Sequence, residues 1–120
     1  MLHAELKAAI DDAFARDLVQ PVELCRDALL VRLNNEAVIG FRFAGDADYS
    51  IGWRWGEARL RIDTAPLHPR LASHPRHLHD SEGRVRADPL TRAGDDAWAN
   101  ARRVIAAVLR DPLLQASGDA

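Results

Sequence analysis

Apolar positions recur at helical spacing in two parts of the chain, near its beginning and near its end. Over residues 2–18, apolar side chains at intervals of three and four alternate with charged ones, which is the pattern of an amphipathic helix. The same spacing returns over residues 95–110, where Asp95 is a candidate cap and the Asp111-Pro112 step ends the helix. The sequence therefore predicts two helices, each with one apolar stripe to bury.

Between these helices the period of the pattern changes to two. Apolar and polar residues alternate in four short segments, at 27–33, 37–43, 49–55 and 58–63. The links between them are short and contain Asn, Asp and Gly, which favours an antiparallel meander. We expect a four-stranded sheet.

The alternation also predicts what each face of the sheet carries. Trp53 and Trp55 share their parity with Ile51, so both tryptophans are expected to be buried against the helices. The opposite parity carries a series of arginines that should face solvent: Arg32, Arg42, Arg54, Arg59 and Arg61.

The stretch 64–89 contains most of the prolines and shows no regular period. We interpret it as a long loop, with a turn at 81–83 and a short edge strand at 84–87. The fold class is α+β: an N-terminal helix, a four-stranded antiparallel meander sheet, a long Pro/His-rich loop and a C-terminal helix packed on one sheet face. Residues 1–112 are expected to form a single domain, and 113–120 a frayed C-terminal tail.

Composition limits the possible classes of protein. With 120 residues and 48% hydrophobic residues, the chain can build one core. The net charge is −2, yet residues 51–92 hold eight arginines and five acids, so positive charge is concentrated there. The single cysteine, Cys25, rules out a disulfide within the chain and a zinc site made of cysteines. An acidic beginning without a long apolar run predicts a cytoplasmic protein that does not use a membrane.

Four of the five histidines lie between Asp63 and Asp80: His68, His74, His77 and His79. Histidine titrates near neutral pH, so such a group can carry protons, bind a metal or contact phosphate. On an extended backbone His77 and His79 project to the same side, and a turn between Pro69 and Pro75 would bring His68 close to them.

Three interpretations of this group remain open. The imidazoles could hold a metal ion, although no cysteine is available and neither Asp63 nor Asp80 stands at a recognised zinc spacing. They could simply bond backbone carbonyls in an irregular loop. They could also cleave a phosphodiester, because RNA cleavage needs a proton acceptor, a proton donor and a cation for the developing charge.

We take phosphodiester chemistry as the leading hypothesis, with no cofactor and no metal, and a metal-independent ribonuclease as one form of it. The candidate catalytic residues are His77, His79, His68 and Asp63, with Asp63 orienting one ring. The candidate substrate-binding residues are Arg54, Arg59, Arg61, Arg70 and Arg76.

The same segment resembles the TumE family of toxins from toxin–antitoxin modules. These toxins carry a strand ending in an Arg/Tyr-Asp-Asn-Ala-Pro type of stretch, a His-Pro step, a Pro-His-His-Lys-His type of stretch and a closing helix. The matching stretches here read RIDTAPLHP at 61–69 and HPRHLHD at 74–80, and the likeness extends over about 45–110. Departures from the family pattern fall at Thr64, Leu67, Arg76 and Leu78.

The resemblance implies a growth-inhibiting toxin that a protein antitoxin, often of the helix-turn-helix type, neutralises. It does not specify the reaction, so RNA as the target rests on the histidines and arginines. Two alternatives belong to other functional classes. One is a non-enzymatic module that binds nucleic acid or an acidic protein, and the other is a metal-binding accessory domain. The oligomeric state stays open, with a homodimer as one option.

Overall fold

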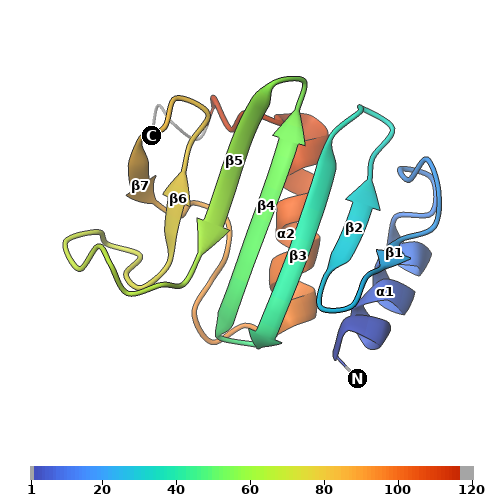
Figure 1. The fold of residues 1–120 in the computed structure, drawn as a ribbon, viewed down its shortest axis with the longest axis horizontal. Coiled ribbons are helices and arrows are strands. Elements are labelled where there is room, and N and C mark those ends of the chain that lie inside the picture. The colour runs from blue at the N-terminus through green and yellow to red at the C-terminus, as the bar shows by residue number, and fades with distance from the viewer. Residues whose placement is uncertain (1, 117–120) are drawn as a thin grey trace.

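The structure, a computed structural model, describes residues 2–116. It contains two helices, α1 (Leu2–Ala13) and α2 (Ala97–Arg110). Seven strands lie between them in the chain: β1 (Glu23–Leu24), β2 (Leu29–Arg32), β3 (Val38–Gly45), β4 (Asp48–Trp55), β5 (Ala58–Asp63), β6 (His77–His79) and β7 (Val85–Ala87) (Figure 1). No helix among these residues combines the length and the apolar character needed to cross a membrane.

All seven strands form one sheet in sequence order, with every neighbouring pair antiparallel. The predicted α+β meander is thus present, and the four predicted strands correspond to β2–β5. The predicted number of strands in the sheet is wrong, because β1, β6 and β7 extend the sheet at both edges. Of these, β7 corresponds to the short edge strand predicted at 84–87, whereas β1 and β6 were not predicted. β1 and β6 have only two and three residues, which is too short to show a period in the sequence.

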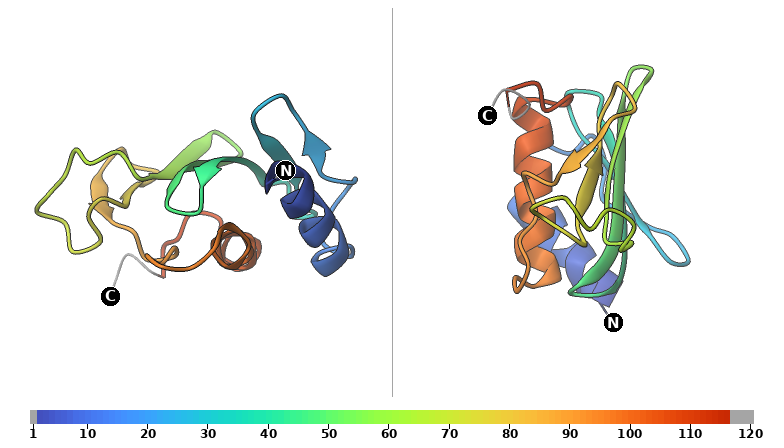
Figure 2. Two further views of the ribbon diagram at one scale, coloured as in Figure 1. Left: turned by 90° about the horizontal axis from the view of Figure 1, so that it is seen from below. Right: turned by 90° about the vertical axis from the view of Figure 1, so that its left-hand side faces the viewer.

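Both helices lie on the same face of the sheet, and in the described part of the chain the opposite face carries no helix (Figure 2). Inward-pointing side chains of five strands pack against the helices, and fully buried examples are Val31, Ile39, Phe41, Ile51, Ile62 and Leu78. The helices supply Ile10, Val104, Ile105 and Val108, none of them measurably exposed. We call the helix-free side of the sheet the outer face.

The helix ends differ in detail from the prediction. Helix α1 stops at Ala13 and not near Leu18, which instead bridges to Leu33 beside the sheet. Helix α2 is capped by Asp96, whose carboxylate accepts a hydrogen bond from the Ala99 amide at 2.8 Å. The predicted cap Asp95 is one residue too early and forms an ion pair with Arg103.

Of the two tryptophans predicted to be buried, only one is. Trp53 is 3% exposed, and its indole N–H donates to the Pro112 carbonyl at 2.7 Å. Trp55 is 40% exposed because it is the last residue of β4, and its indole donates to the Asn35 carbonyl. The prediction for Trp55 was therefore wrong, since parity alone does not show where the core ends.

The packed part of the chain extends beyond residue 112. Leu114 is 1% exposed and belongs to the core, so the start of the expected tail is anchored. The end of that expected tail, 117–120, lies outside the described residues.

Candidate functional site

Pairing of β5 with β6 brings the predicted site residues together. In this ladder Asp63 lies opposite His77, and Arg61 lies opposite His79. Between these pairs Ile62 faces Leu78, and both are fully buried on the inner face. Because residues directly opposite each other share a face, the two polar pairs point to the outer face.

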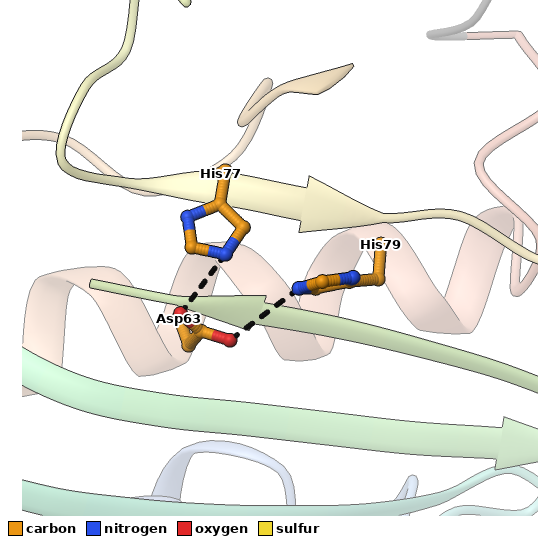
Figure 3. A group of neighbouring side chains, drawn as sticks. All are labelled: Asp63, His77 and His79. Atoms are coloured by element: carbon orange, nitrogen blue, oxygen red, sulfur yellow. Dashed lines mark ion pairs between the residues drawn. The ribbon is translucent and has the colours of Figure 1, made fainter. Parts of the chain in front are cut away.

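The imidazoles converge on one carboxylate (Figure 3). Nε2 of His77 lies 3.0 Å from Oδ1 of Asp63, and Nε2 of His79 lies 3.6 Å from Oδ2. The side chains differ in exposure: 1% for His77, 14% for Asp63 and 30% for His79. Of these two imidazoles, His79 is therefore the more open to a ligand.

Hydrogen bonds determine which ring nitrogens carry protons. Nδ1 of His77 lies 3.1 Å from the Pro75 carbonyl, which can only accept, so this nitrogen donates. An Arg61 guanidinium nitrogen lies 3.1 Å from Nε2 of His79, and since the guanidinium can only donate, this Nε2 accepts. Burial and the positive charge of Arg61 hold the pKa of His79 below its usual value, consistent with a neutral ring.

The carboxylate of Asp63 is held from two further sides. Its Oδ2 accepts a bond from Nε of Arg61 at 2.9 Å, and its Oδ1 accepts one from the Ala65 amide at 3.1 Å. The contact with His77 then has a specific requirement. Two lone pairs facing each other at 3.0 Å would repel, so a proton or a cation has to lie between Nε2 of His77 and Oδ1 of Asp63.

The remaining predicted histidines divide between the cluster and the loop. The ring of His68 stands edge-on to His77 at 4.7 Å between centroids, and 6.4 Å from His79. His74 is exposed and makes no ring contact with the other three among residues 2–116. His68, His77 and His79 with Asp63 and Arg61 form what we call the histidine cluster.

The predicted arginines do not all reach this face. Arg54 and Arg59 are exposed on the outer face, and no carboxylate among residues 2–116 pairs with either. Arg70 is exposed in the loop. Arg76 is turned away from the cluster and lies 3.6 Å from Asp88, so its assignment to substrate binding has to be corrected. Arg76 immediately precedes β6, where its side chain points to the inner side of the sheet.

A buried polar network holds Arg76, and the sequence pattern did not indicate it. The Asp88 carboxylate accepts bonds from the Thr91 hydroxyl and from the Leu90 and Thr91 amides, while Arg76 donates to the Thr91 carbonyl. The Tyr49 hydroxyl donates to the same threonine at 2.7 Å, and burial raises the pKa of that phenol. The network fixes the segment that enters β6 and so positions His77. No signal in the sequence distinguished these residues from ordinary loop polar groups.

Two open hollows meet at the cluster on the outer face. One, of about 520 Å³, is lined by four members of the cluster, Arg61, Asp63, His77 and His79, and by other residues that include Arg42 and Leu67. The other, of about 430 Å³, is lined by Gly40 and Gly52, which lie opposite each other on β3 and β4, and by Arg54 and Arg59. Arg61 and His79 line both, so a ligand in either hollow would contact these two side chains.

Asp63, His77 and His79 are also the residues able to hold a metal ion. One ligand atom from each lies within 4.8 Å of the others.

No protein-family model, curated protein or solved structure matches this chain.

Proposed function

We propose that the chain is a TumE-like toxin of a two-gene toxin–antitoxin module, and that it acts on RNA or another phosphate-bearing target through the histidine cluster. The observation that carries the proposal is the direct contact of Arg61 with His79, at the junction of the two hollows. A cation and a neutral imidazole whose Nε2 lone pair accepts from that cation are thus presented together on one open surface. Phosphodiester cleavage requires a proton acceptor and a cation of this kind, together with a proton donor for the leaving oxygen.

Three members of the cluster have distinct parts in this proposal. His79 is the catalytic residue, because its side chain lines both hollows and its Nε2 can take the proton of an attacking hydroxyl once Arg61 turns from it to the phosphate. Arg61 stabilises the charge that develops on the phosphate oxygens. His77 is a positioning residue: it is 1% exposed and acts through its contact with Asp63.

The outer face supports a single strand as the target. Arg54 and Arg59 extend the positive charge of Arg61 along β4 and β5, without carboxylate partners among residues 2–116. A basic track with an open surface suits the phosphates of an unpaired chain. A protein antitoxin with an acidic segment would fit the same track.

The proposal is tested by growth inhibition in bacteria that express the chain without an antitoxin. We expect His79→Ala to abolish growth inhibition, since losing a general base typically lowers a rate by about 10²–10⁴-fold. His74→Ala is the matched control, because it removes an exposed histidine from the same loop and should remain toxic. Circular dichroism and melting curves of both purified variants check that they fold. A folded His79→Ala variant with full toxicity would refute the proposed role.

A second candidate function is binding of nucleic acid without cleavage, and the exposed Arg54 and Arg59 favour it. Replacing both with glutamate should weaken binding to a single-stranded RNA and flatten its salt dependence. For every phosphate that the variant no longer neutralises, the slope of log K against log salt should become shallower by about 0.7. Binding is measured by fluorescence anisotropy across a salt series, with Arg26→Glu and Arg102→Glu together as the control for net charge. An unchanged slope would exclude this track as the binding surface.

The two candidates separate in one comparison. If His79→Ala still binds RNA but no longer cleaves it, the chain is an enzyme. If the wild-type chain binds and never cleaves, the non-enzymatic function holds.

A further inference from the structure

We propose that Asp63, His77 and His79 form a binding site for one divalent cation of the zinc class, with the Nε2 atoms of both imidazoles and a carboxylate oxygen as ligands. The inference goes beyond the proposed function, because it needs neither RNA nor an antitoxin. It also differs from the expectation of no metal drawn from the sequence, where Asp63 did not stand at a zinc spacing.

The distances between the ligand atoms suit a small tetrahedral ion. Zinc bonds to nitrogen and oxygen of about 2.0–2.1 Å at tetrahedral angles place neighbouring ligand atoms about 3.3 Å apart. In the structure, Nε2 of His77 lies 3.0 Å from Oδ1 of Asp63 and Nε2 of His79 lies 3.6 Å from Oδ2, so each imidazole stands at about this separation from a different carboxylate oxygen. One ligand atom from each of the three residues lies within 4.8 Å of the others, and the three side chains would close in around a small ion.

The orientation of the ligands is already fixed by their other hydrogen bonds. Nδ1–H of His77 donates to the Pro75 carbonyl, which leaves Nε2 as the nitrogen turned toward Asp63. Metal-bound histidines commonly donate their second N–H to a carbonyl in this way. Nε2 of His79 accepts a bond from Arg61 and so already presents a lone pair. The Ala65 amide holds the carboxylate from behind.

A cation would also answer the requirement set by the contact between His77 and Asp63. His77 is buried, and a proton or a cation has to lie between its Nε2 and the carboxylate oxygen 3.0 Å away. A divalent ion bound by the three residues would accept the lone pairs of both Nε2 atoms and of the carboxylate oxygen.

The donor set indicates the chemical class of the ion. Two imidazoles and one carboxylate favour zinc and neighbouring transition metals over magnesium or calcium, which prefer oxygen ligands. Within residues 2–116, the group of three such ligand residues whose ligand atoms lie within 4.8 Å of one another consists of these side chains. A tetrahedral ion would keep its fourth position open toward the 520 Å³ hollow, as in catalytic zinc sites.

Arg61 is the side chain that opposes metal binding. Its guanidinium contacts both Nε2 of His79 and Oδ2 of Asp63, so it occupies directions that an ion would use. The side chain is 52% exposed and has room to withdraw. Replacing it with an uncharged residue removes both the steric and the electrostatic competition.

The test is titration of the purified chain, freed of metal by a chelator, with zinc in an isothermal calorimeter. We expect one ion per chain. His79→Ala and Asp63→Asn should each weaken binding by at least about 10-fold, because even outer contacts of a metal site are worth about 10–100-fold. His74→Ala should bind as the wild type does, and Arg61→Gln should bind more tightly.

The Arg61→Gln variant keeps the test decisive if a ligand variant fails to fold. Circular dichroism checks that Arg61→Gln is folded, because an unfolded chain could bind zinc through its exposed histidines. A gain in zinc affinity by the folded variant supports the site, whereas an unchanged or lower affinity would contradict it. Cobalt(II) supplies a second readout, since a tetrahedral site gives intense visible absorption that His79→Ala should remove. Binding that His79→Ala leaves unchanged, or no binding up to millimolar zinc, would overturn the inference.

These outcomes are separate from those of the proposed function. A chain that binds zinc but does not inhibit growth would support the metal site and refute the toxin. A chain that inhibits growth through His79 without binding zinc would do the reverse. In particular, Arg61→Gln should strengthen zinc binding while weakening any action on phosphate.

Discussion

Replacing Asp88 with alanine should lower the free energy of unfolding by about 3–5 kcal/mol, the usual cost of removing one partner from a buried ion pair. The Asp88 side chain is completely buried and lies 3.6 Å from Arg76, which is itself mostly buried. Without the carboxylate, the Arg76 guanidinium loses its ion-pair partner, and the Leu90 and Thr91 amides lose their acceptor. The stability of a domain is about 5–15 kcal/mol, so this loss is a large part of it.

Urea unfolding followed by fluorescence measures this effect. Asp95→Ala is the matched control, because its ion pair with Arg103 is partly exposed and pairs of that kind contribute about 0–1 kcal/mol. Asp88→Asn should fall between the two, since the amide oxygen can still accept from the backbone. Equal effects of Asp88→Ala and Asp95→Ala would mean that the network does not support β6.

The second large effect is expected at Trp53. Trp53→Ala should cost about 3–5 kcal/mol, because it empties a large buried volume in the core. It also leaves the Pro112 carbonyl without its indole partner. The same change at Trp55 should cost about 1 kcal/mol, close to the value of one hydrogen bond, because that ring is 40% exposed.

The two tryptophan variants control each other, since they remove the same side chain two residues apart on one strand. Both are measured by urea unfolding with circular dichroism, which does not depend on the tryptophans removed. A Trp55→Ala variant as unstable as Trp53→Ala would show that the core extends to the end of β4.

The central strands could be predicted from the sequence because their period is determined by burial on one side. β2–β5 have inward residues that are almost completely covered, so hydrophobic alternation marks them clearly. β6 has one inward residue, Leu78, between two histidines that face the outer side. One apolar position does not define a period, and the strand was therefore interpreted as part of a loop.

The members of the cluster could also be named from the sequence, but not their arrangement. The spacing of His77 and His79 places both on one side of an extended segment wherever that segment lies. That Asp63 stands opposite His77, and Arg61 opposite His79, depends on the register of β5 against β6. Burial of Leu78 against Ile62 sets this register, and a sequence alone does not reveal such a long-range choice.

The location of the cluster on a strand ladder has a consequence for how the chain tolerates changes in length. Asp63 and His77 meet through the pairing of β5 with β6 and not through the connection between them. An extra residue near the exposed Pro69–Arg70 turn would lengthen that connection at a small entropic cost and leave the pairs opposite each other. An extra residue between His77 and His79 would reverse the side to which one imidazole points. The distance in sequence from Asp63 to His77 is thus free to vary, whereas the two-residue step from His77 to His79 is not.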